Sequence, residues 1–192
     1  EFRRVLFRSK GCVFANFALD GSGKGQLDAG LLQLNNAVGF LVDHVYVYDG
    51  GTPGEAGSSG VNGITMSAGD FGATGSEGWI RNCLVERTTK AGFNVSTETV
   101  NVVIENCIAR DCEGNGQTPG FQVLGAENAK LIGCTAYRNE GVGFVLGTTG
   151  TDVSTYRFAK YGIVANCHAY ENGQGTTEGH GFKVENVAGQ VS

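Results

Sequence analysis

Short stretches of alternating apolar and polar residues recur along most of the chain. Around Cys107, the segments 100–106 (VNVVIEN), 107–110 (CIAR) and 120–123 (GFQV) each alternate with a period of two residues. That period is typical of β-strands, in which successive side chains point to opposite faces. No segment shows a clear helical period. The pattern therefore predicts short strands, three to a unit, separated by turns.

The three-strand unit repeats. One strand of each unit opens with Cys-x-(Ala or Val), and the steps from Cys83 to Cys107, Cys134 and Cys167 are 24, 27 and 33 residues by subtraction of their numbers. Each copy is followed by a Gly-φ-x-φ segment, where φ is an apolar residue, and these segments begin at Gly92, Gly120, Gly143 and Gly181. Phe17 and Val45 take the Cys position in two earlier copies, which makes six coils. A repeat of this length indicates stacked supersecondary units.

The alignment assigns side chains to the inside or the outside of the stack. The inward columns are Phe93/Phe121/Phe144/Phe182, Val95/Val123/Leu146/Val184, the Cys position, and Val85/Ala109/Ala136/Ala169. A gapless overlay of 29–45 on 91–107 also predicts outward columns on the Gly-φ-x-φ strand, namely Leu32, Thr65, Asn94, Gln122, Val145, Lys183 and then Leu34, Ser67, Ser96, Leu124, Gly147, Glu185. Insertions at 50–62, 68–78, 112–119, 147–159 and 172–180 are predicted to project as loops.

A turn residue precedes each Cys position, and four of the six are asparagine: Asn16, His44, Asn82, Asn106, Gly133 and Asn166. Asparagine tolerates the left-handed backbone conformation that a tight turn needs. We therefore expect a left-handed turn at this position in every coil, with amide side chains that can bridge from one coil to the next.

With three strands per coil, an Asn row and stacked apolar columns, the chain resembles the right-handed parallel β-helices of the pectate-lyase-like superfamily. The resemblance covers Gly11 to about Val187 and implies an all-β solenoid of about six coils, truncated at both ends. It does not specify an activity, because the superfamily includes lyases, glycosidases, epimerases, phage tailspikes and adhesins.

Residues 91–125 are also similar to part of the mannuronan C5-epimerases, which act on alginate. The catalytic pattern of that family is Tyr-Gly-Phe-Asp-Pro-His, followed one coil later by Gly-Phe-x-x-Asp. Carried over by position, its Tyr, first Asp, His and later Asp fall on Ala91, Asn94, Ser96 and Leu124. The resemblance therefore implies that this segment lacks the groups that the epimerase reaction requires.

Composition narrows the classes of partner. The chain has 32 glycines among 192 residues and a net charge of −5, and it contains neither a basic stripe nor an apolar run of about 20 residues. Nucleic acid and a membrane span are therefore not expected. Four of the six cysteines occupy one repeat position, which favours buried thiols over disulfides. No spacing of cysteine or histidine indicates a zinc site.

The outer surface of the Cys strand carries the best candidate site. Its two outward columns are Ala18, Tyr46, Leu84, Ile108, Thr135, His168 and Asp20, Tyr48, Glu86, Arg110, Tyr137, Tyr170. Arg110 could pair with a uronate carboxylate, while Tyr137 or His168 could act as the base of a β-elimination. Tyr46, Tyr48, Tyr170 and Glu86 are candidate sugar contacts, as are Asn94 and Gln122 on the Gly-φ-x-φ strand. The alternative is purely structural: cross-strand pairing of Glu86 with Arg110 and of Tyr137 with Tyr170.

Calcium is a candidate ligand at the turns after the Cys strand, where Asp49, Asp111, Glu113 and Glu171 gather. No loop has the spacing of a known calcium motif, so solvated turn carboxylates are the alternative.

Two functional hypotheses follow. Residues 1–9 (EFRRVLFRS) resemble a translated sequencing adapter and fit no repeat, so we expect 10–192 to be the β-helix domain, a fragment of a longer chain. The first hypothesis is an extracellular or cell-surface protein that binds or processes acidic polysaccharide, as a lyase or related enzyme if it is active. The alternative is a non-catalytic structural or adhesive β-helix, such as an adhesin, a surface protein or a tailspike shaft.

Overall fold

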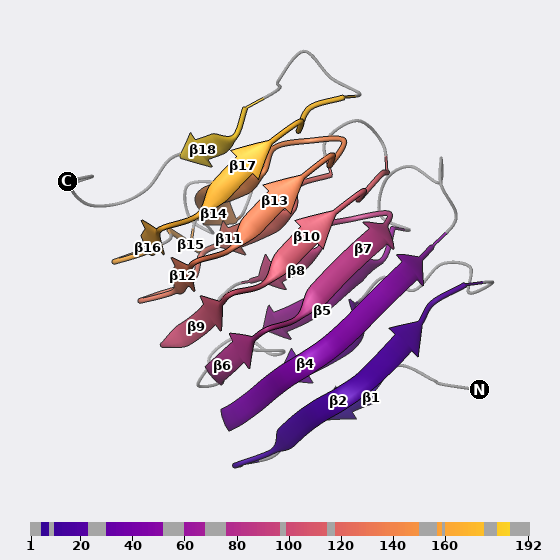
Figure 1. Ribbon diagram of the computed structural model, residues 1–192. Coiled ribbons are helices and arrows are strands. Elements are labelled where there is room, and N and C mark those ends of the chain that lie inside the picture. The colour runs from indigo at the N-terminus through magenta and orange to yellow at the C-terminus, as the bar shows by residue number, and fades with distance from the viewer. Residues whose placement is uncertain are drawn as a thin grey trace.

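The protein is a stack of short strands joined by turns, seen in a computed structural model (Figure 1). The structure describes residues 5–7, 10–22, 30–51, 60–67, 76–96, 99–114, 118–149, 157–158, 160–174 and 180–184. None of these residues forms a helix of the length and apolarity that a membrane span requires. The described part of the chain is β-structure throughout.

The first sheet contains the Gly-φ-x-φ strand of each coil. Its parallel strands are β1 (Val5–Phe7), β3 (Gly30–Asn35), β5 (Asn62–Ser67), β8 (Phe93–Val95), β11 (Phe121–Leu124), β14 (Phe144–Thr149) and β18 (Phe182–Val184). Within the 147–159 insertion, β15 (Arg157–Phe158) pairs antiparallel with the end of β14. We call this sheet one.

The remaining strands form a ten-stranded sheet that bends along one line of turns. On one side of the bend lie β6 (Glu77–Arg81), β9 (Val102–Glu105), β12 (Lys130–Ile132) and β16 (Ile163–Ala165), which we call sheet two. On the other side lie β7 (Leu84–Thr88), β10 (Ile108–Arg110), β13 (Thr135–Tyr137) and β17 (His168–Tyr170), which we call sheet three. Two longer strands, β2 (Val13–Asp20) and β4 (Val38–Gly50), run through both sides.

This arrangement is a parallel β-helix with three faces, as the repeat predicts. Each strand pairs in parallel with its equivalent in the next coil, so equivalent residues lie directly over one another; Ile108, for example, pairs with Leu84 and with Thr135. Adjacent strands are about 4.8 Å apart in such pairing. The fold therefore converts sequence columns into ladders of side chains.

The predicted core columns are confirmed in the inner coils, whereas Phe182 and Val184 of the last coil are about half exposed. The rings of Phe93, Phe121, Phe144 and Phe182 stack with centroids 4.7 to 4.8 Å apart, and the first three are fully buried. Cys83, Cys107 and Cys134 are buried, and all six cysteines are free thiols. Val85, Ala109, Ala136 and Ala169 lie in one register column, as predicted.

The row of residues before the Cys position bends the backbone as predicted. All six have a left-handed backbone, with φ between 51° at His44 and 63° at Gly133. The expected bridging of amides along this row is wrong: in the described structure these side chains form no hydrogen bonds with one another, not even Asn82 with Asn106 in the adjacent coil. Asn82 instead donates from Nδ2 to Asp43 Oδ1 at 3.0 Å.

A bridging amide ladder occurs at another turn, between sheets three and one. Asn139 Nδ2 donates to Asn172 Oδ1 at 2.9 Å, and Asn172 Nδ2 donates to the carbonyl of Ala136 at 2.9 Å. Asn139 Oδ1 accepts from the backbone N–H of Cys112 at 3.2 Å. These amides, of which Asn139 is fully buried, satisfy turn groups that the strands leave unpaired.

The predicted outward positions of Leu32 and Leu34 are wrong. Leu32 pairs with Ile64 and Leu34 with Met66, and both leucines are buried. Gln33 is the residue that pairs with Thr65, which in turn pairs with Asn94. The gapless overlay was one residue out of register here, and a slip of one residue exchanges the two faces of a strand.

The insertions lie largely outside the described residues, as do Glu185 and most of the first nine residues. Within those nine, the backbone of Val5–Phe7 pairs with Leu32–Leu34 of β3.

Burial of the phenylalanine stack predicts a graded cost of truncation. We expect Phe121→Ala to lower the free energy of unfolding by about 3–5 kcal/mol, because it opens a cavity in a fully buried column. Phe182→Ala is the matched control, since Phe182 stands in the same column but is 49% exposed; its cost should be less than half as large. Denaturant unfolding monitored by circular dichroism measures both, and equal costs would contradict a closed core at Phe121.

Candidate functional site

The outer side of sheet three gathers most of the predicted site residues. Register pairing places Tyr48 beside Glu86, Glu86 beside Arg110, Arg110 beside Tyr137, and Tyr137 beside Tyr170. Tyr46 lies on the same strand as Tyr48, two residues earlier. We call this surface the Tyr face; it comprises Tyr46, Tyr48, Glu86, Arg110, Tyr137 and Tyr170. Because the pairing is parallel, one residue from each of five coils meets in a single line.

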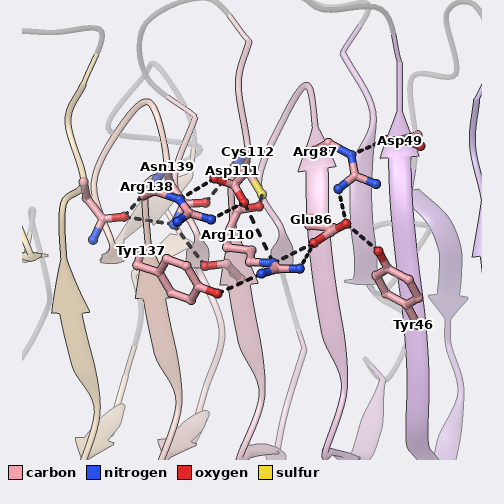
Figure 2. Close-up of polar contacts among 12 residues, drawn as sticks. Tyr46, Asp49, Glu86, Arg87, Arg110, Asp111, Cys112, Tyr137, Arg138 and Asn139 are labelled. Atoms are coloured by element: carbon pink, nitrogen blue, oxygen red, sulfur yellow. Dashed lines mark hydrogen bonds and ion pairs between the residues drawn. The ribbon is translucent and has the colours of Figure 1, made fainter.

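Glu86 is the centre of this line (Figure 2). Only 2% of its surface is exposed. Its carboxylate accepts a hydrogen bond from the hydroxyl of Tyr46 and another, of 2.6 Å, from Arg110 Nε. It also forms an ion pair with Arg87 Nη1. Arg110 also donates from Nη1 to Tyr137 Oη at 3.1 Å. A single carboxylate thus connects Tyr46, one coil away on one side, with Tyr137, two coils away on the other.

A second row of charges lies at the C-terminal ends of these strands. It consists of Asp49, Arg87, Asp111, Arg138 and Glu171, whose signs alternate and whose φ values all lie between 50° and 55°. Arg87 pairs with Asp49, and Arg138 binds Asp111 through two hydrogen bonds, of 2.7 and 2.9 Å. Alternation therefore provides each arginine with an acid in the neighbouring coil.

The network holds its groups in their charged forms. Burial raises the pKa of Glu86, but the hydrogen bond from Tyr46 and the contacts with Arg110 and Arg87 outweigh it and leave the pKa below 4.5. Burial, together with the Glu86 charge, raises the pKa of Tyr46. The hydrogen bond from Arg138 lowers the pKa of Asp111. Glu86 and Asp111 are therefore ionised at neutral pH, and Tyr46 is a neutral hydrogen-bond donor.

Two tyrosine pairs flank the charged centre. Tyr137 and Tyr170 are stacked at 4.9 Å with nearly parallel rings, and Tyr46 and Tyr48 stack at 4.6 Å. Arg138 lies 4.9 Å from the ring centre of Tyr137. Tyr170 is 49% exposed. Such rings offer flat apolar surfaces next to hydrogen-bonding groups.

The structure separates the other predicted residues from this cluster. His168 is exposed on β17 and pairs with Thr135, in the column next to that of Tyr137. Asn94 and Gln122 pair with each other on sheet one, a different face of the solenoid. Arg110 and Tyr137 are in direct contact, whereas the described contacts include none between His168 and either of them.

Sequence reasoning did not assign Arg87 and Arg138 to the site. Both have a left-handed backbone at the end of a strand, a conformation in which an arginine is uncommon and asparagine or glycine is usual. The strand pattern ended one residue before them. The available signal was the alternation of charge at equivalent turn positions, Asp49, Arg87, Asp111, Arg138 and Glu171.

Three of the four carboxylates considered for calcium border one hollow of about 590 Å³, which is lined by Asp111, Glu113, Arg138, Glu140, Glu171 and Gln174; Asp49 lies outside it. Within the described ranges, no three His, Cys, Asp or Glu side chains are placed to hold a metal ion. Asp111 is bound by Arg138, and Glu140 accepts from the backbone N–H of Gly114 at 2.6 Å.

Comparison with known proteins gives one family. The family model described as "Right handed beta helix region" matches residues 9–159 and 73–191, which together span nearly the whole chain. The chain belongs to the right-handed β-helix family. Searches of curated proteins and of solved structures found no match. Family membership fixes the handedness of this β-helix and leaves its activity open, since the match does not single out the epimerases.

Removal of the central carboxylate should destabilise the β-helix. In Glu86→Gln, Arg87 and Arg110 lose a charged acceptor at a site that water barely reaches, so we expect a loss of about 2 kcal/mol in the free energy of unfolding. The matched control is Asp111→Asn on the more exposed pair with Arg138, which should cost less than about 1 kcal/mol. Urea denaturation at neutral pH distinguishes them; a cost for Glu86→Gln no larger than the control's would contradict a central role for Glu86.

The same network predicts an acid-sensitive contribution to stability. The pKa of Glu86 is lower in the folded protein than the ordinary 4.5, so its contribution is fully present above that value and is lost as the pH falls below it. The difference in unfolding free energy between the wild type and Glu86→Gln should therefore shrink from about pH 4.5 downwards. Urea titrations across this range measure it, and a difference independent of pH would show that the carboxylate charge does not matter.

Proposed function

We propose that the chain is a glycan-binding β-helix that recognises acidic polysaccharide through the Tyr face. The observation that carries the proposal is that two tyrosine pairs and three arginines share one outer surface, with Arg110 between the pairs and Arg87 and Arg138 each over a tyrosine ring. Aromatic rings provide stacking surfaces for sugar rings, and guanidinium groups bind carboxylates with matched geometry. Coil-to-coil spacing of about 4.8 Å would present these groups to successive positions along an extended chain.

Exposure divides the arginines into two roles. Arg110 is oriented toward Glu86 and Tyr137, and 32% of its side chain is exposed. Arg87 and Arg138 are each 48% exposed, and each lies over a tyrosine ring. In this proposal Arg110 orders the surface from within, and Arg87 and Arg138 offer N–H groups to uronate carboxylates. Binding would require those carboxylates to share the arginines with Asp49 and Asp111.

A lyase reaction is the less favoured form of this proposal. Elimination would need Tyr137 or His168 to remove a proton while Arg110 neutralises the uronate carboxylate. Arg110 already neutralises Glu86, which favours binding without turnover. If elimination does occur, the contact between Arg110 and Tyr137 makes that tyrosine the candidate base.

A scaffold is the second candidate, and the burial of Glu86 favours it. Glu86, Arg87 and Arg110 satisfy one another inside the surface, in the way that cross-strand pairs stabilise sheets. Under this alternative the protein is a structural or adhesive β-helix whose columns exist for stacking. Either function would place it outside the cell or on its surface, where extended glycans occur, and that location belongs to the proposal.

Glycan binding is tested by calorimetric titration with oligomers of alginate and polygalacturonate. We expect saturable binding that weakens on the order of tenfold in Tyr170→Ala, which removes an exposed ring from one stack. The matched control is Asn94→Ala, which alters an outward residue of sheet one and should leave the affinity unchanged. Ultraviolet absorbance of the unsaturated product reports any elimination in the same samples.

The outcomes separate the candidates. Binding without product supports recognition alone, and product that disappears in Tyr137→Phe makes the protein a lyase. Binding that Asn94→Ala weakens and Tyr170→Ala does not would move the site to sheet one and overturn the proposal. Absence of binding to every acidic glycan would overturn the proposal and leave the structural scaffold as the remaining candidate function.

A further inference from the structure

Sheet two has a different outer surface, with an apolar column along it. Register pairing aligns Val13, Leu41, Trp79, Val103, Lys130 and Ile163 in consecutive coils. Trp79 is 49% exposed at the middle of this column, and Leu41 and Val103 flank it. An indole that is half exposed on a flat sheet costs hydration free energy unless something covers it, so it is a candidate contact for a ligand.

A groove of about 490 Å³ lies beside the indole. Its volume falls in the range of small-molecule sites, roughly 300–1,000 Å³. Gly39 and Gly78 line it and contribute no side chain to fill it. Polar residues complete the rim: Glu77, Asn101, Asn128 and Lys130. One flat aromatic surface is therefore surrounded by hydrogen-bonding groups.

The hydrogen-bonding capacity of this rim is largely unused. Asn128 Nδ2 donates to Asn101 Oδ1 at 2.8 Å, which fixes the two amides relative to one another and leaves Asn101 Nδ2 and Asn128 Oδ1 as a donor and an acceptor. Both asparagines are held by left-handed backbone, with φ of 52° and 54°. In the described structure, neither Glu77 nor Lys130 forms an ion pair. The rim thus presents both hydrogen-bond donors and hydrogen-bond acceptors around the indole.

We infer that this groove is a second glycan site, which binds one neutral pyranose unit stacked on Trp79. A pyranose ring has an apolar C–H face that matches an indole and a circumference of hydroxyl groups that both donate and accept. Glu77 and Lys130 cancel in charge, so the rim favours neither a uronate nor a phosphate. The residues and the sheet differ from those of the Tyr face, so this inference stands without the proposed function.

Two other classes of ligand fit the groove less well. A nucleotide would need basic side chains for its phosphates, and the rim supplies one lysine opposed by one glutamate. A protein partner would fit a continuous apolar stripe, whereas Lys130 and the amides of Asn101 and Asn128 interrupt this one. Hydroxyl-rich, uncharged rings match both the flat surface and the rim.

Trp79 provides a direct readout because it is the single tryptophan of the chain. Its fluorescence is followed during titration with cellohexaose, xylohexaose, laminarihexaose, maltohexaose and mannohexaose, and with triguluronate as the charged comparator. We expect a saturable change with at least one neutral oligosaccharide and none with triguluronate. Calorimetry with the oligosaccharide that binds should then show affinity weakened on the order of tenfold or more in Trp79→Ala.

Two further variants make the result specific. Asn128→Ala keeps the fluorophore and removes a rim acceptor, and it should weaken the same binding several-fold. Tyr170→Ala is the matched control on sheet three and should leave the fluorescence titration unchanged. No fluorescence response to any of the five neutral oligosaccharides would overturn the inference, as would equal affinity in Trp79→Ala. A concentration-dependent shift of Trp79 emission without sugar, accompanied by dimers in sedimentation, would also overturn it in favour of self-association.

Discussion

Parallel hydrogen bonding between successive coils is the constraint on which the rest of the structure depends. Each strand must pair with its equivalent one coil away, so residues at equivalent positions are stacked about 4.8 Å apart along the axis. Apolar residues then form continuous columns, as Phe93, Phe121 and Phe144 do. Stacking also places polar residues of the same column in contact, and a column of like charges would repel. Whatever the protein recognises is presented on this fixed grid.

On the outer surface, alternation of charge between coils avoids repulsion within a column. Arg87 and Arg138 alternate with acids at the turns, and Glu86 stands next to Arg110 within the strands. Burial of Glu86 beneath three partners couples four coils into one polar network that ends at Tyr137, so the surface is ordered before any ligand arrives. Such preorganisation lowers the entropic cost of binding, and it contributes equally well to a rigid shaft. The same geometry thus explains why binding and scaffolding are the two functions in contention.

The repeat could be predicted from the sequence far better than the side-chain contacts could. Periodicity alone placed Phe121 inside and Arg110 outside, because alternation in a strand leaves little freedom. It failed at Leu32, where coils of unequal length shift the register by one residue, and such a shift has no local signature. It also missed Arg87 and Arg138, because the left-handed backbone at these two residues interrupts the two-residue period of the strand. Asn94 and Gln122, which the repeat already assigns to the Gly-φ-x-φ strand, lie on sheet one and therefore away from the Tyr face.

Mapping of backbone amide chemical shifts during titration with alginate oligomers tests the central claim most directly, since it reports which face of the solenoid meets a glycan. The account predicts that the largest changes fall on sheet three, at Glu86, Arg110 and Tyr137, and on the adjoining turn at Arg138. Changes concentrated at Asn94 and Gln122 on sheet one, with sheet three silent, would contradict it.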